Sequence, residues 1–216
     1  SIVGENGEGK STIIKLLLGL FSPDKGEILI GGKKLSEYPM RIRSKIFGPV
    51  FQDFSRYSIT IKENIGIGDI DEIDNNEKIK VAAQKSKIDS FVEKLEKGYD
   101  TLLGRDFEGG IDISGGQWQK IALARDLYAN GKIEFLDEPT AALDAKSEAE
   151  IYERFLRENN QKTIFFVTHR LSAVKFADKV LFLDSGKVSG FDTHANLLNK
   201  NAKYQEMYKK QKNAYI

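Results

Sequence analysis

The sequence has no cysteine among its 216 residues, which excludes disulfide bonds and thiolate metal sites and agrees with a reducing cytoplasmic setting. It also has no apolar run near the roughly 20 residues that cross a bilayer, and we expect no signal peptide in it. Neither sign of charge is in excess, because 33 Lys and Arg residues face 32 Asp and Glu residues for a net charge of +1. We therefore expect no nucleic-acid partner, and any membrane-spanning part would have to come from other sequence.

The sequence does contain enough apolar residues to form a buried core. Apolar residues make up 40% of the chain and charged residues 30%, a balance typical of a folded domain. It contains no internal repeat or low-complexity tract. We expect one domain with room for an inserted lobe.

The strongest pattern lies at the beginning of the chain. Residues 4–11 read GENGEGKS, which fits the G-x-x-x-x-G-K-[ST] pattern of a phosphate-binding loop. Its glycines let backbone N–H groups approach an anion, Lys10 adds a charge for the β- and γ-phosphates, and Ser11 offers a hydroxyl to Mg²⁺. The apolar run that follows predicts a helix whose positive end starts at the same place. The predicted nucleotide-binding residues are Gly4, Glu5, Asn6, Gly7, Glu8, Gly9, Lys10, Ser11 and Thr12.

Strand-like and helix-like segments alternate along the remaining chain. This alternation is typical of an α/β fold with a mostly parallel sheet and crossover helices. Within residues 58–129 the strand signal disappears, which predicts a helical subdomain inserted in a core lobe of residues 1–57 and 130–216. A solvated amphipathic helix is predicted for the tail. The predicted strands are 27–30, 46–51, 133–137, 163–168, 180–183 and 187–191, and the predicted helices are 11–20, 76–88, 89–96, 115–127, 146–158, 171–176 and 195–212, with Ser114 as the N-cap of the fourth.

Two carboxylates stand at the end of the predicted strand 133–137. Asp137 ends the strand and Glu138 follows it, so both emerge at the carboxyl edge of the sheet, where open α/β folds bind ligands. Asp137 suits the coordination shell of Mg²⁺ beside a phosphate loop. Glu138 suits a group that orients or deprotonates an attacking water.

Four further segments resemble the motifs of the ATP-binding cassette (ABC) ATPases. The segment ISGGQ at 113–117 is similar to the family signature, and DEPTAALD at 137–144 to the second acidic motif with its D-loop. FQD at 51–53 resembles the Q-loop, and THR at 168–170 the segment of the switch histidine. All occur in family order and cover nearly the whole chain. The resemblance implies a P-loop NTPase core with a helical subdomain that carries the signature.

The resemblance also implies how ATP and Mg²⁺ are bound. Two nucleotide-binding domains would form a head-to-tail dimer, with each ATP between the phosphate loop of one and the signature segment of the other. His169 would hold the γ-phosphate, and Gln52 would contact Mg²⁺ and the attacking water. The catalytic residues so implied are Lys10, Gln52, Glu138 and His169, the metal ligands are Ser11, Gln52 and Asp137, and the residues that reach the partner's ATP are Ser114, Gly115, Gly116, Gln117 and Asp144.

Some positions depart from the family pattern. Ile113 stands where leucine is more frequent, a volume-conserving change that we expect to be harmless, and Lys120 stands where arginine is common. Only three residues precede Gly4, whereas a strand normally has about 5 to 6 residues, so we expect the sequence to begin inside this strand. The aromatic residue that stacks on adenine in the family would then precede Ser1.

The segment 185–194 is similar to exporter members of the family with a fused upstream membrane domain. The resemblance therefore implies an exporter ATPase at the cytoplasmic face of the membrane, which drives transmembrane domains encoded upstream. Two alternatives stay open at this point. A soluble cassette ATPase of translation or DNA repair would carry a second cassette or a long coiled coil, and a small-molecule kinase would have no signature segment.

Overall fold

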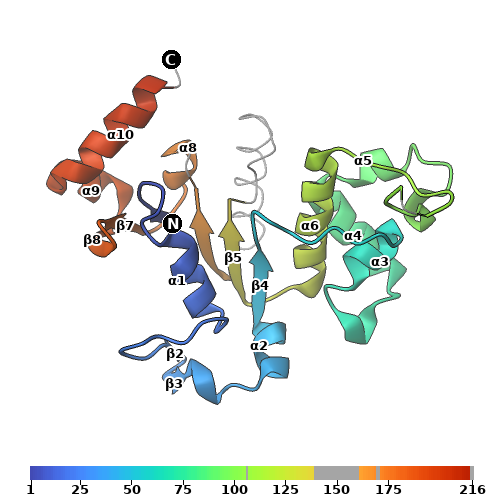
Figure 1. Cartoon of the computed structure of the whole chain (residues 1–216), viewed down its shortest axis with the longest axis horizontal. Helices are drawn as coiled ribbons and strands as arrows, with labels where there is room; N and C mark the ends of the chain where they lie inside the picture. The colour runs from blue at the N-terminus through green and yellow to red at the C-terminus, as the bar shows by residue number, and fades with distance from the viewer. Residues whose placement is uncertain (106, 139–160, 169–170, 215–216) are drawn as a thin grey trace.

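The computed structural model describes residues 1–105, 107–138, 161–168 and 171–214. In this part of the chain, six strands form one sheet in the order β4-β5-β6-β1-β7-β8 (Figure 1). All neighbours are parallel except β7 and β8, which form an antiparallel hairpin. The predicted α/β fold with a mostly parallel sheet is confirmed. The strands are β1 (Ile2–Val3), β4 (Phe47–Val50), β5 (Ile133–Asp137), β6 (Thr163–Val167), β7 (Val180–Asp184) and β8 (Lys187–Asp192).

The first strand, β1, lies inside this sheet. Ile2 pairs with Val167 of β6 on one side and with Leu181 of β7 on the other. Because β1 leads directly into the phosphate-binding loop, the loop lies at the carboxyl edge of the sheet. Helix α1 (Lys10–Leu17) starts there and ends three residues before the predicted end, close to Gly19 with its positive φ of 70°.

Alternate side chains of the strands pack on different helices, as the two-residue period of a strand requires. On one face, Phe135 and Val167 share a buried cluster with Ile14 of α1. On the other face, Leu136 packs with Leu123 of α6 (Gly115–Ala129). The sheet is therefore covered on both faces, and its carboxyl edge is the place where the loops gather.

The predicted helical region forms a core of its own beside the sheet (Figure 1). Trp118 of α6 is only 5% exposed in this cluster, while Leu123 of the same helix faces the sheet. Helix α6 thus joins the two cores. The subdomain boundaries at residues 58 and 129 stay a prediction. The other helices of the region are α3 (Ile61–Gly66), α4 (Asn76–Ser86) and α5 (Asp89–Val92), with the 3₁₀ turns η2 (Ile70–Glu72) and η3 (Gly98–Asp100).

The predicted strand 27–30 is shorter than expected and belongs to another sheet. Strand β2 (Leu29–Ile30) pairs only with β3 (Lys33–Lys34), in a separate two-stranded hairpin. Gly31 and Gly32 have φ angles of 57° and 79°, as a two-residue hairpin turn of this kind requires. The chain then passes through η1 (Leu35–Glu37) and α2 (Met40–Ile46) before it reaches β4.

The prediction of one solvated tail helix is wrong in two respects. The tail forms α9 (His194–Lys200) and α10 (Ala202–Ala214), because Asn201 leaves the helical conformation and its Oδ1 accepts a hydrogen bond from the N–H of Tyr204 at 3.0 Å. The apolar face is also not solvated. Tyr204 is fully buried against Phe182 of β7. The tail therefore covers one end of the sheet.

The short helix α8 (Leu171–Val174) follows β6, and the predicted helix 146–158 lies outside the described residues. Within the part of the chain that the structure describes, no helix combines the length and the apolar character needed to traverse a bilayer.

Candidate nucleotide-binding site

The loop between β1 and α1 has a backbone that leaves room for an anion. Gly7 and Gly9 have φ angles of 86° and 90°, a left-handed conformation that glycine adopts without strain, and a Cβ atom on either would meet nothing within 4 Å. Gly4 is required for space, because a Cβ atom there would lie 2.7 Å from the backbone oxygen of Leu183. Among the described residues, no side chain caps the start of α1, so its first N–H groups are available to a phosphate.

Lys10 brings the charged groups of the site together. Its side chain is nearly buried, and its ammonium donates to two carbonyl oxygens of the loop at 2.7 and 3.0 Å. Burial lowers the pKa of Lys10, while the charges of Glu138, Asp137 and Glu8 oppose that shift. The predicted phosphate-binding lysine and the two predicted acidic residues therefore lie close enough to affect one another. Of the other loop residues, Glu5, Asn6, Ser11 and Thr12 are exposed.

The two acidic residues differ in their surroundings. Asp137 is only 6% exposed, and its Oδ1 has no hydrogen-bond partner among the described residues. A buried carboxylate oxygen without a donor is unfavourable unless a cation binds it, so Asp137 fits a ligand of Mg²⁺. Glu138 is half-buried and has a φ of 50°, a conformation unusual for a residue other than glycine. Its N–H donates to the carbonyl oxygen of Val167 at 3.2 Å.

Gln52 lies at the same edge of the sheet as the acidic residues. It is exposed and follows β4, which pairs in parallel with β5 so that Val50 lies opposite Leu136. Parallel strands end at one edge, so Gln52 and Asp137 project from neighbouring strand ends. Figure 1 shows the loop before α1 at this same edge. The structure thus gathers the phosphate loop, Asp137, Glu138 and Gln52 on one side of the sheet.

The signature segment forms a capped helix start elsewhere in the molecule. The N–H of Gln117 donates to Ser114 Oγ at 3.3 Å, and the N–H of Ser114 donates to Gln117 Oε1 at 2.7 Å, which confirms Ser114 as the N-cap. The hydroxyl of Ser114 still has its own proton to donate. Both Ser114 and Gly115 are exposed, and Gly116 is half-buried. In Figure 1, β4 and β5 lie between α6 and α1, so the segment does not reach the phosphate loop of its own chain.

Two predicted site residues cannot be placed. Asp144 and His169 lie outside the described residues, so their roles stay predictions.

Glu8 makes a contact that the sequence did not indicate. Its Oε2 accepts a hydrogen bond from the N–H of Gly186 at 2.6 Å, in the turn between β7 and β8. Lys203 of α10 forms an ion pair with Asp184 at the base of the same turn, and the charge of Glu8 contributes to a raised Lys203 pKa. An acidic side chain in an anion-binding loop is therefore directed to a donor outside the loop. No local pattern links residues so far apart in sequence.

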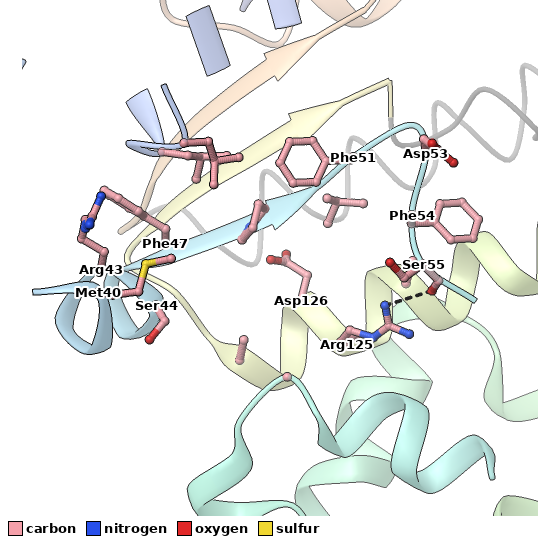
Figure 2. Close-up of a pocket in the computed structure, with 17 residues that line it drawn as sticks. Met40, Arg43, Ser44, Phe47, Phe51, Asp53, Phe54, Ser55, Arg125 and Asp126 are labelled. Carbon is pink, nitrogen blue, oxygen red and sulfur yellow. Dashed lines mark hydrogen bonds between the residues drawn. The ribbon is translucent and has the colours of Figure 1, made fainter. Parts of the chain in front are cut away.

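A separate pocket lies beside β4, between α2 and α6 (Figure 2). Its wall is mostly apolar and includes Phe47 and Phe51. Arg125 of α6 turns toward the loop after β4 and donates to the carbonyl oxygen of Ser55 at 3.2 Å, whereas Asp126 points toward the strand (Figure 2). The lining residues come from the segment after α1, from α2, β4 and the loop that follows it, from Gly68 and from α6, and none belongs to the phosphate loop. This pocket is thus distinct from the candidate nucleotide site.

Comparisons with known proteins agree with this geometry. Residues 1–141 match the profile of the family described as ABC transporter. The chain is 40% identical over 207 residues to the subtilin transport ATP-binding protein SpaT of Bacillus subtilis, covering 96% of this chain and 34% of that protein. It is 39% identical over 201 residues to the mitochondrial iron-sulfur clusters transporter ATM1 of Saccharomyces cerevisiae, covering 92% of this chain and 28% of that protein.

A solved structure gives the same result at the level of the fold. It is described as a bacterial Atm1-family ABC exporter with ATP bound, and it matches with a TM-score of 0.88 and 35% identity over 97% of this chain and 36% of that chain. The chain thus spans about a third of the length of these relatives. The profile match and the sequence identities show that the chain belongs to the ABC transporter family, as an ATP-binding domain.

Proposed function

We propose that this domain binds ATP with Mg²⁺ at the carboxyl edge of its sheet and that hydrolysis drives export through transmembrane domains of a longer protein. The similar proteins are named as transporters or exporters and are about three times as long as this chain. Their names favour an exporter over a soluble cassette ATPase of translation or repair. The domain would then work at the cytoplasmic face of the membrane.

The observation that carries the proposal is the gathering of Lys10, Asp137 and Glu138 at one edge of the sheet. Lys10 supplies positive charge to the β- and γ-phosphates, and Glu138 orients the attacking water or accepts its proton. Ser11, Gln52 and Asp137 would hold Mg²⁺, which neutralises charge on the phosphates when bound. The buried Oδ1 of Asp137, which has no hydrogen-bond partner in the described ranges of the chain, supports this ligand set.

A second nucleotide-binding domain completes the site in this proposal. The exposed start of α6 offers a hydroxyl and glycine N–H groups to an anion, yet it lies away from α1 of the same chain. A head-to-tail dimer would bring Ser114, Gly115, Gly116 and Gln117 of one domain to the γ-phosphate held by the other. By family motif, His169 would stabilise charge on that phosphate and Asp144 would shape the partner's site.

The test is the Glu138→Gln variant of the intact protein. Gln keeps the size of the side chain but cannot accept a proton, so ATP affinity should stay within about twofold while turnover falls by about a hundredfold or more. Equilibrium ATP binding and steady-state phosphate release measure the two quantities. Glu77→Gln makes the same chemical change at an exposed site on α4 and should leave both unchanged. Full-rate hydrolysis by Glu138→Gln would remove Glu138 from this role.

The membrane part of the proposal has its own measurement. The intact protein should sediment with membranes on fractionation and stay there after a high-salt wash, because transmembrane helices hold it. Recovery of the intact protein in the soluble fraction would favour the soluble cassette ATPases.

A further inference from the structure

Two acidic residues that ATP hydrolysis does not use lie buried between α6 and the sheet. Asp126, in the last turn of α6, is 4% exposed, and Glu134 of β5 is 0% exposed. Both carboxyl groups reach Gly48 of β4, where an added Cβ atom would collide with Glu134 Oε2 and with Asp126 Oδ1. The two acids therefore face each other at the junction of one helix with two strands of the core.

The charges of this cluster do not balance if both acids are ionised. The ammonium of Lys162 lies 2.6 Å from Glu134 Oε1. Neither oxygen of Asp126, nor Oε2 of Glu134, has a hydrogen-bond donor among the N–H and O–H groups of the described residues. Two buried carboxylates beside one ammonium would leave an unpaired negative charge, which is strongly unfavourable. One added proton removes that excess and supplies the missing donor.

The charged groups on the surrounding elements do not supply this balance. Arg125 precedes Asp126 on α6, but its guanidinium bonds to Asn64 and to Ser55. Arg43 of α2 lines the adjacent pocket and donates to a carbonyl oxygen of residue 19 at 3.3 Å. Asp53, after β4, adds a further negative charge at the rim of that pocket (Figure 2).

The position of the proton follows from the surroundings of each acid. Burial, followed by the nearby charge of Glu134 and the hydrogen bond that a protonated Asp126 can donate to it, raises the pKa of Asp126 well above its usual value. Burial also raises the pKa of Glu134, but hydrogen bonds from Lys162 and Asp126 act against this shift. These directions favour Asp126 as the carboxyl that carries the proton, while Glu134 is the acid that pairs with Lys162. The three groups together are neutral.

We propose that Asp126 and Glu134 share one proton at neutral pH and that this pair, balanced by Lys162, positions α6 on the sheet for ATP hydrolysis. The proposal rests on the proposed function, because α6 starts at the signature segment and β5 ends at Asp137, next to Glu138. Loss of the proton sets two carboxylates against each other and pushes the end of α6 away from β5. Alkaline pH then lowers turnover although the acid pair touches neither ATP nor Mg²⁺.

The raised pKa of the acid pair determines whether folding stability rises or falls with pH. A carboxyl whose pKa is raised in the folded state contributes its stability below the unfolded-state pKa and loses it as the pH rises through the folded-state pKa. Between these two values the folded protein holds one proton more than the unfolded protein. The folding equilibrium constant should therefore fall by up to about tenfold per pH unit in this range, owing to this pair.

The experiment compares the intact protein with its Asp126→Asn variant. The Asn amide donates to Glu134 without a titrating proton, so the variant should lose this component of the pH dependence of unfolding, measured without ATP by chemical denaturation. Its turnover number should lie within about twofold of wild type at pH 7. At alkaline pH the wild-type turnover number should fall by about tenfold per pH unit, whereas that of the variant should fall little or not at all. Asp24→Asn makes the same change at an exposed site and should keep both wild-type profiles.

A second variant guards against poor folding of the first. Glu134→Gln leaves Asp126 as the single acid beside Lys162, so Asp126 ionises and the alkaline decline should again be lost. Wild-type pH profiles in both variants would overturn the proposal, and so would a changed unfolding profile with an unchanged turnover profile, since the pair would then not position α6 for catalysis. A wild-type protein without ATPase activity would refute the proposed function instead, while the unfolding data would still decide on the proton.

Discussion

Single residues of the phosphate loop combine an anion-binding backbone with side chains of opposite charge. Lys10 is held on the loop's own carbonyl oxygens, so its ammonium is already ordered beside the cradle formed around Gly7 and Gly9. Glu8, between the two glycines, would repel a triphosphate if it pointed into the cradle. Its bond to Gly186 directs the carboxylate to the β7–β8 turn instead.

Replacing Lys10 by Ala should weaken ATP binding itself. The ammonium makes charge-assisted hydrogen bonds to phosphate oxygens, and the loss of such bonds costs about 1.5–3 kcal/mol, or about tenfold to a hundredfold in affinity. Equilibrium titration with a fluorescent ATP analogue measures this effect. Lys15→Ala, in the last turn of the same helix, removes an equal charge and should have little effect. Unchanged affinity in Lys10→Ala would contradict the loop assignment.

Substitutions of Glu8 test whether ATP binding by the loop depends on the hydrogen bond between Glu8 and Gly186 or on the charge of Glu8. Glu8→Ala loses the acceptor for Gly186, and we expect the KM for ATP to rise about fivefold, equivalent to about 1 kcal/mol, with kcat nearly unchanged. Glu8→Gln keeps an acceptor oxygen and should stay within about twofold of wild type. If both variants raise KM equally, the hydrogen bond is not what holds the loop.

At the scale of elements, helix α6 has a different role at each end. Its start is capped by Ser114 and exposed, its middle joins the helical cluster to the sheet, and its last turn carries the buried acid Asp126. Its side chains are apolar or buried on nearly all sides, as expected for a helix enclosed between two cores. We therefore expect a displacement at one end of α6 to affect the other end.

Substitutions of Ser114 can separate the cap from the anion site. Ser114→Ala removes the capping oxygen and should lower the free energy of unfolding by about 1 kcal/mol. Ser114→Asp keeps a good cap but faces the γ-phosphate with a negative charge, so stability should be retained while turnover falls about a hundredfold. Ser114→Asn also caps the helix but carries no charge, so it serves as the matched control, and its turnover should fall less than that of Ser114→Asp. Thermal unfolding and phosphate release measure the two effects, and wild-type turnover in Ser114→Asp would contradict the anion site.

Elements with local signals could be predicted from the sequence, whereas contacts between distant segments could not. An apolar run predicts strand β5, which has the predicted ends. A Ser followed three residues later by Gln is typical of a helix start, and Ser114 is the N-cap as predicted. The break at Asn201 depends on its bond to Tyr204, a residue held by packing against β7. The Glu8–Gly186 bond and the Asp126–Glu134 pair require the tertiary fold, because no periodicity or motif relates their positions.

At the scale of the whole molecule, the two anion-binding regions of one chain lie apart, on either side of the central strands (Figure 1). Each is open on its own: no side chain in the described part of the chain caps α1, and Ser114 is exposed. In the proposed head-to-tail dimer, a second copy or a similar domain would complete both sites, because two-fold symmetry uses the same pair of surfaces twice.

Mixing two inactive variants tests this arrangement directly. A dimer of Lys10→Ala with Ser114→Asp has one site in which both parts are intact and one in which both are damaged. When the two full-length variants are mixed in equal amounts and exchange subunits, half of the dimers contain one copy of each. Each mixed dimer has one undamaged site out of two, so the mixture should show roughly a quarter of the wild-type ATPase rate. Each variant alone should stay inactive. Absence of any recovery would show that loop and signature act within one chain.

The place of β1 inside the sheet has a consequence for biosynthesis. Ile2 and Val3 are translated well before their hydrogen-bonding neighbours, β6 and β7, which lie far along the sequence. Contacts so remote in sequence form slowly, so the nascent strand waits unpaired while the rest is made. We therefore expect the glycine loop to take its shape only when β1 pairs with these strands, so that a bound nucleotide would stabilise the completed domain.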